Sequence, residues 1–96
     1  MTTEALSLEL RPQLAPKCKL RLDPKTGKYI LLYPEKGLLL NPTGAAILTL
    51  CDGQRTLSAI IAALAVEFHS DAETLRAEVL NFVQGLLDRG LLQAAP

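Results

Sequence analysis

The sequence predicts an α+β fold: a three-stranded antiparallel β-meander followed by a three-helix bundle, an arrangement like a winged helix-turn-helix. Three observations predict it. Between residues 17 and 40, short segments with strand patterning are separated by turn sequences. From residue 42 onward, apolar residues recur at helical spacing between residues that typically begin and end helices. The chain of 96 residues is long enough for one such domain.

The N-terminal region carries weaker signals than the rest. Residues 1–15 are expected to be a tail that is flexible or ordered only by a partner, and residues 16–93 to be the folded domain. Leucines alternate with polar residues in the tail, which is typical of a strand, but Pro12 and Pro16 separate this stretch from the first strand of the meander.

Three strands are expected, at residues 17–22, 28–33 and 38–40. Basic and apolar residues alternate over the first, the period of a half-buried strand. The turn sequence at residues 23–27 predicts a hairpin between the first two strands, and residues 34–37 turn into the third. The second and third strands are apolar on both faces, which indicates a partner site, an oligomer contact or cover by the tail.

The helices are bounded by capping residues. Asn41 before Pro42 and Thr56 are suitable N-caps, and Ser70 with Glu73 predicts a capping box for the third helix. Glycine stops the first helix at Asp52-Gly53 and the third at Arg89-Gly90, after which Leu91 and Leu92 can return to the core. The helices therefore span about 42–51, 57–68 and 71–89. The residues expected to face the core are Ala46, Ile47 and Leu50, then Leu57, Ile60, Ile61, Leu64 and Phe68, then Leu75, Val79, Phe82, Val83 and Leu86.

Composition argues against nucleic-acid and membrane binding. Ten basic and ten acidic residues cancel, and only four residues are aromatic, so bases have little to stack on. The third helix would read DNA in a winged-helix regulator, but it carries four acids and two arginines, so acids would face phosphates. No apolar run approaches the roughly 20 residues of a membrane span, and no signal peptide is evident. A cytoplasmic protein is expected.

The chemistry-bearing residues do not form a catalytic or metal motif. His69 falls at the end of the second helix, where the helix dipole favours a cation. The acids between residues 71 and 78 suit the first turns of the third helix, and no HExxH or phosphate-loop spacing occurs. Cys18 and Cys51 are isolated from each other and are expected to be buried thiols. We therefore expect no enzyme activity, no metal and no cofactor.

With these classes of function set aside, the remaining class is the binding of another protein or peptide. A short third strand at a sheet edge beside an amphipathic helix forms a groove suited to an added peptide strand. Backbone groups along the edge would hold the peptide, and pockets between strand and helix would select its side chains. Because the second and third strands are apolar on both faces and an uncapped edge invites pairing, we also expect a homodimer at high concentration.

The segment KYILLYPEKGLLLNPTGAAILTLCDGQRTLSAIIAAL, with the closing FVQGLLDRGLL, resembles the PqqD-like peptide-recognition domains, small peptide chaperones of pyrroloquinoline quinone (PQQ) biosynthesis. The likeness covers about residues 16–93. Its most specific parts are Leu40-Asn41, the helix end from Ile47 to Gly53, Thr56, and Gly90-Leu91-Leu92.

The resemblance implies a non-catalytic escort. Family members bind the precursor peptide PqqA as an extra strand and deliver it to the radical S-adenosylmethionine enzyme PqqE, which cross-links a glutamate and a tyrosine of the peptide. Related domains serve other ribosomally made, modified peptides, and this is the alternative function. Carried onto this sequence, the peptide groove would consist of Gly37, Leu38, Leu39 and Leu40 with Leu75, Arg76, Val79 and Val83. Because an escort holds both partners at once, we expect the enzyme at a separate surface, formed by Asp88, Arg89, Gly90 and Leu91.

Overall fold

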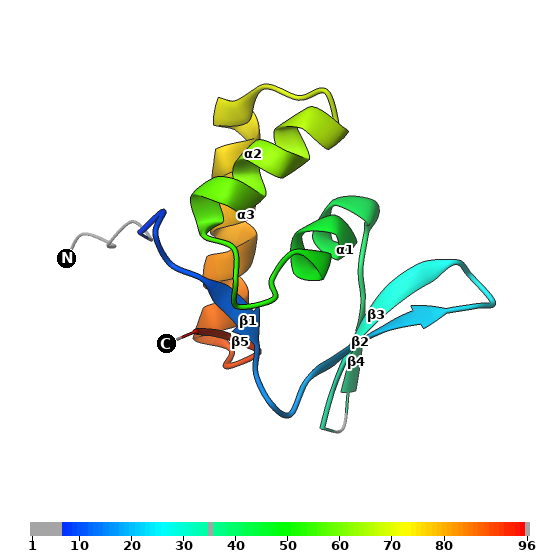
Figure 1. Ribbon diagram of the computed structural model, residues 1–96. Coiled ribbons are helices and arrows are strands. Elements are labelled where there is room, and N and C mark those ends of the chain that lie inside the picture. Colours follow the sequence, from blue (N-terminus) through cyan, green and yellow to red (C-terminus); the bar gives the residue numbers. More distant parts are fainter. Residues whose placement is uncertain (1–6, 35, 96) are drawn as a thin grey trace.

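The computed structural model describes residues 7–34 and 36–95. It confirms the α+β class, with a three-stranded antiparallel meander followed by three helices (Figure 1). A short two-stranded sheet formed by the two ends of the described chain, β1 and β5, was not expected from the sequence. The elements in chain order are β1 (Pro12–Leu14), β2 (Lys19–Asp23), β3 (Lys28–Tyr33), β4 (Lys36–Leu39), α1 (Pro42–Thr49), α2 (Leu57–Glu67), α3 (Ala72–Asp88) and β5 (Leu92–Ala94).

The meander has the order β2-β3-β4, and β3 begins and ends as the sequence predicts. The turn between β2 and β3 is closed by Asp23, whose carboxylate accepts hydrogen bonds from the Lys25 N–H and the Thr26 hydroxyl, both at 3.1 Å. Gly27 completes the turn with a φ of 72°, a conformation that glycine adopts without a Cβ clash. Local turn chemistry therefore fixes the register of this hairpin.

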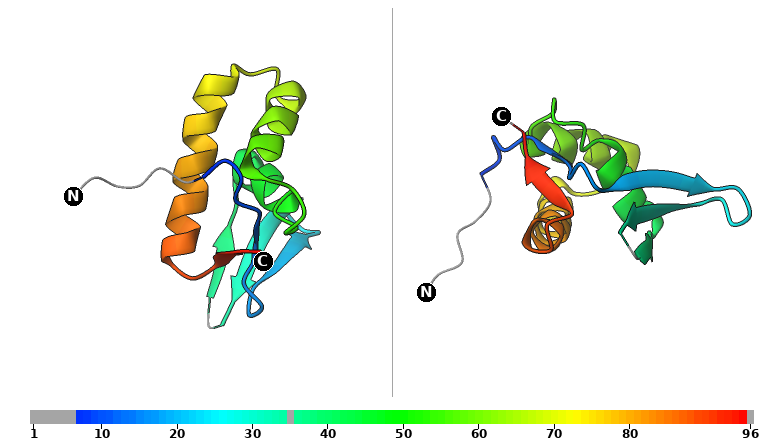
Figure 2. Two further views of the ribbon diagram at one scale, coloured as in Figure 1. Left: turned by 60° about the vertical axis from the view of Figure 1, so that its left-hand side comes forward. Right: turned by 90° about the horizontal axis from the view of Figure 1, so that it is seen from below.

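The sheet has an inner and an outer face. Leu31 and Leu40 are 0% and 4% exposed, and α1 contacts β3, so the face that carries these two leucines is the inner one. Side chains alternate along a strand, so Ile30, Leu32 and Leu39 lie on the opposite, outer face. No helix covers the outer face in any of the three views (Figures 1 and 2).

Two of the three predicted helix starts are confirmed. The Asn41 side chain accepts a hydrogen bond from the Gly44 N–H at 2.7 Å, and the Thr56 hydroxyl accepts one from Ala59 at 3.1 Å. The predicted Ser70 capping box is wrong. Asp71 caps α3 instead, accepting from the Thr74 N–H at 3.2 Å, while the Ser70 hydroxyl donates to the carbonyl of Phe68. A carboxylate at the helix start also interacts favourably with the helix dipole.

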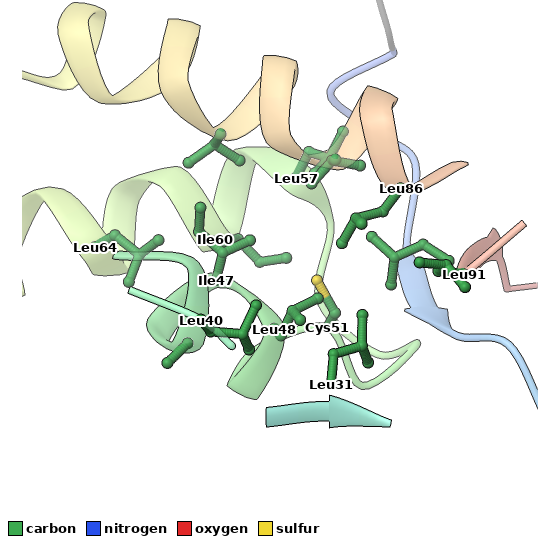
Figure 3. Close-up of a cluster of buried hydrophobic side chains, with 14 of the residues drawn as sticks. Leu31, Leu40, Ile47, Leu48, Cys51, Leu57, Ile60, Leu64, Leu86 and Leu91 are labelled. Carbon is green, nitrogen blue, oxygen red and sulfur yellow. The ribbon is translucent and has the colours of Figure 1, made fainter. Parts of the chain in front are cut away.

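The core lies between the inner face of the sheet and the three helices. Figure 3 shows Leu31 and Leu40 pointing towards Ile47 and Leu48 of α1, with Leu57, Ile60 and Leu64 of α2 on the side away from the strand that carries Leu31. In α1 the buried face consists of Gly44, Ala45, Ile47 and Leu48, whereas Ala46 and Leu50, which were expected to face inward, are half-buried. Gly44 sets this phase because the Phe82 ring of α3 packs against it, and a methyl group there would lie 3.2 Å from the ring. In α2 and α3, all the expected positions are buried except Phe68 and Phe82, which are half-buried.

The segment expected to be a tail differs most from the sequence analysis. Residues 1–6 lie outside the described part, but Pro12–Leu14 forms β1, which pairs antiparallel with β5. The carbonyls of Leu8 and Leu10 accept hydrogen bonds from the first N–H groups of α2, at 3.0 and 2.9 Å. Helix starts leave such N–H groups without a partner inside the helix. The described residues before Pro16 therefore form part of the folded unit, and the fold begins before residue 16.

Candidate functional site

The free edge of β4 offers an ordered row of backbone groups. The Leu40 N–H donates to the Tyr29 carbonyl at 2.9 Å, which fixes the phase of the β3–β4 hydrogen bonds. Bonded and non-bonded residues alternate in an antiparallel pair, so Leu38 bonds to β3, whereas Gly37 and Leu39 direct their N–H and C=O groups away from it. Among the described strands, none pairs with this side of β4. An extended peptide could therefore hydrogen-bond to Gly37 and Leu39.

The expected groove wall on α3 is not present as predicted. Leu75, Val79 and Val83 are 3%, 0% and 0% exposed, so their side chains belong to the core and leave no surface for a peptide. Arg76 is exposed and lines a cavity of about 150 Å³ together with Ile61 of α2. Of these four residues, the structure therefore leaves only Arg76 accessible to a partner.

Different residues of α3 lie near the meander. The half-buried Phe82 contacts Gly44 of α1, and the guanidinium of Arg89, the residue that follows α3, donates to the Tyr33 hydroxyl at 2.9 Å. The same guanidinium lies 5.8 Å from the centre of the Tyr33 ring, within the range of a cation–π contact. The first contact joins α3 to α1, and the Arg89 contacts join the end of α3 to β3. The sequence could not indicate the Arg89–Tyr33 pair, because its members are 56 positions apart.

The expected enzyme-contact segment is only partly at the surface. Asp88, Arg89 and Gly90 are exposed, but Leu91 is 3% exposed and packs in the core. The Asp88 carboxylate accepts a hydrogen bond from the Gln84 amide at 2.8 Å. Three of the four residues are thus accessible to a partner, and one is structural.

A pocket of about 380 Å³ lies between the β2–β3 turn and α1. Its wall is mostly apolar. Glu67 also lines it, and so does Lys28, although strand alternation directs the Lys28 side chain to the outer face. The pocket adjoins the end of β4 through Leu40 and Asn41, so it could accept a side chain that continues from an edge-bound peptide. Sequence reasoning missed this pocket, and its only signal is the pair of small residues Ala45-Ala46 facing a strand end.

Among the residues that the structure describes, Cys51 and Asp52 have clearly perturbed pKa values. Burial, reinforced by the charge of Asp52, raises the pKa of the Cys51 thiol from 9.0 to about 12, so the thiol is protonated and inert near neutral pH. The pKa of Asp52 is lowered, chiefly because its carboxylate accepts hydrogen bonds from the backbone of Gln54 and Arg55. Both cysteines are free and buried, as expected.

Over residues 7–34 and 36–95, no three His, Cys, Asp or Glu side chains gather closely enough to hold a metal ion. Within the same stretches, no helix has the length and apolar character to cross a membrane.

Comparisons of the sequence and the structure with known proteins agree with one another. The sequence model of the PqqD family, described as coenzyme PQQ synthesis protein D, matches residues 28–92. Two proteins of Rhodopseudomonas palustris named PqqA binding protein are similar. That of strain HaA2 is 36% identical over 95% of this chain and 89% of its own length, and that of strain BisB5 is 38% identical over 88% and 83%.

A solved structure also matches. It is the solution structure of the PqqD truncation of Methylobacterium extorquens PqqCD, described as a functional, stand-alone recognition element for ribosomally synthesised, post-translationally modified peptides. It superposes with a TM-score of 0.74 at 32% identity, covering 85% of this chain and 87% of that one.

Proposed function

Because this chain belongs to the PqqD family, we propose that it binds the precursor peptide PqqA as an added β-strand and presents it to the radical enzyme PqqE in PQQ biosynthesis. The observation that carries the proposal is the free edge of β4, where Gly37 and Leu39 direct unpaired backbone groups outward. The relatives named PqqA binding protein and the recognition-element title of the matching structure support the choice of a peptide as ligand.

Backbone groups of the β4 edge would provide affinity for the peptide, and burial of peptide side chains beside the edge would provide selectivity. Each main-chain hydrogen bond to a peptide contributes about 0.5–1.5 kcal/mol net. A fully buried aliphatic side chain of the peptide adds roughly 1.5–3 kcal/mol. A few of each, less the cost of ordering a flexible peptide, gives binding near the micromolar level, about −8 kcal/mol. The pocket beside Leu40 offers a place on the inner side for such a side chain.

We propose that the chain itself carries out no chemistry on the peptide and acts in the cytoplasm without a cofactor. The histidine is exposed at the end of α2, and the Cys51 thiol is held protonated in the core, so neither is placed to act on a peptide at β4. PqqE would supply the reaction. Incubating the purified chain with PqqA alone should leave the mass of the peptide unchanged, whereas a modified product would overturn this part of the proposal.

Self-association at high concentration is a further part of the proposal. Leu22 is 50% exposed on β2, at the edge of the meander opposite to β4. A second copy pairing along that edge would leave β4 free for the peptide. Light scattering across a concentration series should show a dimer forming, and a strict monomer into the millimolar range would count against it.

Calorimetric titration tests the central proposal. The chain should bind a PqqA peptide near the micromolar level and should bind an unrelated modified-peptide precursor at least tenfold more weakly. Equal or stronger binding of the unrelated precursor would assign the domain to another peptide pathway, and binding to neither would overturn the proposed function.

A further inference from the structure

The outer face of the meander combines an apolar centre with basic surroundings. The strand register places Ile30, Leu32 and Leu39 together on this face, with Lys19 directly opposite Leu32 and Arg21 directly opposite Ile30. Lys28 lies two positions before Ile30 on the same strand, hence on the same face. We use the name outer face for the surface formed by Lys19, Arg21, Lys28, Ile30, Leu32 and Leu39.

The apolar centre is accessible. Leu39 is 56% exposed and is paired with the half-buried Ile30, next to the half-buried Leu32, so the three residues form an apolar patch. Gly37 keeps Ile30 and Leu32 within reach, since a methyl group there would lie 3.3 and 3.4 Å from their side chains and would cover them in part. Figure 2 shows the hairpin of β2 and β3 extending away from the helices, so nothing in the described chain covers this face.

The charge of the chain is strongly polarised although its net value is zero. Residues 17–39, which contain the meander, hold six Lys or Arg against two Asp or Glu. Residues 67–88, which contain α3, hold five Asp or Glu against one Arg. On the outer face, the one carboxylate in the register is that of Asp23, and hydrogen bonds within the turn occupy it. The outer face therefore attracts an acidic partner.

The side chains of the outer face indicate which class of partner it would bind. Its apolar residues are aliphatic, and both tyrosines of β3 lie on the inner face with Leu31, so bases or sugars have nothing to stack on. Three basic side chains spaced around an aliphatic centre match a protein surface that has an apolar contact ringed by carboxylates.

The outer face is also continuous with the proposed peptide edge. Leu39 contributes its side chain to the outer face and its backbone N–H to the edge, so the two surfaces meet at this residue. An enzyme docked on the outer face would thus stand directly beside a peptide added to β4. The segment Asp88–Leu91 offers less, because Leu91 is buried and Arg89 is bonded to Tyr33.

We infer that the outer face is the docking surface for the enzyme that receives the peptide, and that it binds an acidic patch of that enzyme. This inference rests on the proposed function and adds to it the surface and the chemistry of the second partner.

Charge reversal tests the inference, with PqqE as the probe. Lys19→Glu/Arg21→Glu should weaken PqqE binding on the order of tenfold or more at low salt, because it replaces complementary charges by repelling ones. The loss should shrink as salt rises, because exposed charges are screened. Affinity for the PqqA peptide should stay within about twofold of the parent. Arg11→Glu/Lys17→Glu, which reverses two charges at exposed positions outside the outer face, is the matched control.

Each result of these binding measurements supports or contradicts a specific part of the inference. Unchanged PqqE affinity in Lys19→Glu/Arg21→Glu, with circular dichroism like that of the parent, would overturn the inference. A loss in Arg89→Glu but not in the outer-face variant would move the enzyme to the end of α3. Equal losses of affinity for PqqE and for the peptide would also overturn the inference, since the two surfaces would not be separate.

The parent protein distinguishes the inference from the proposed function. A parent that binds PqqE but no PqqA would refute the proposed function and leave the docking surface standing. If the parent bound duplex DNA or anionic vesicles through these residues and did not bind PqqE, the partner class would be wrong.

Discussion

Replacing Leu39 by proline should weaken peptide binding without unfolding the meander. The N–H of Leu39 points away from β3, so proline removes a hydrogen-bond donor from the free edge and none from the β3–β4 ladder. The lost bond contributes about 0.5–1.5 kcal/mol, and the peptide carbonyl left without a partner adds about 1–3 kcal/mol. At 1.4 kcal/mol per tenfold change, PqqA should bind at least about tenfold more weakly in a calorimetric titration.

The opposite edge of the meander supplies a matched control. Leu22 is exposed to a similar extent, and by the same alternation its N–H points away from β3 on the β2 side, so Leu22→Pro makes the same chemical change at the other edge. Leu39→Ala keeps the N–H and removes only the side chain. Both controls should bind within a few-fold of the parent, whereas Leu38→Pro should unfold the sheet. If Leu39→Pro, folded by circular dichroism, bound PqqA as the parent does, the edge assignment would be wrong.

Three predictions concern the scaffold. His69→Gly should raise the free energy of unfolding by about 1 kcal/mol, because His69 has a φ of 51° and glycine relieves that strain; a lower denaturation midpoint would contradict this. Gly53→Ala should lower the same free energy by about 1–2 kcal/mol, because Gly53 has a φ of 80°, which strains any residue with a Cβ, whereas the flexible Gln13 side chain, whose oxygen would lie 2.6 Å from the new Cβ, can move aside; an unchanged midpoint would speak against this backbone conformation. Cys51 should resist alkylation at pH 8 until urea unfolds the protein, as followed by mass spectrometry. Because its pKa is raised on folding, its contribution to stability is full below about pH 9 and is lost as pH rises towards about 12; stability that increased over this range would show that the thiol is not buried.

Much of the fold could be predicted because its signals are local. Asn41 and Thr56 cap helices through bonds to residues three positions on, and Asp23 closes its own turn. The pairing of β1 with β5 could not be predicted, since it joins the two ends of the chain and the proline of β1 argues against a strand. The orientation of α1 could not be predicted either, because this short helix has apolar residues on all sides. The contact between Gly44 and Phe82 of α3 decides which side faces inward.

The candidate site was predictable on the strand and not on the helix. The edge position of β4 follows from the order of a meander, and Gly37 and Leu39 lie where a peptide could reach them. On α3, the periodic positions of Val79 and Val83 identify the core, and the same periodicity cannot separate a core position from a groove position. The sequence indicates a row of basic residues on the first strand, but only the register of the sheet places Ile30, Leu32 and Leu39 beside them.

Amide hydrogen exchange at the two edges of the meander tests the central claim most directly. In the free protein, the outward N–H groups of Gly37 and Leu39 on β4 and of Leu20 and Leu22 on β2 should all exchange quickly. With a saturating PqqA peptide, the β4 amides should become protected, because each donates to the added strand, while the β2 amides should exchange as before. Protection at Leu20 and Leu22 instead, or at neither edge, would contradict peptide binding by strand addition to β4.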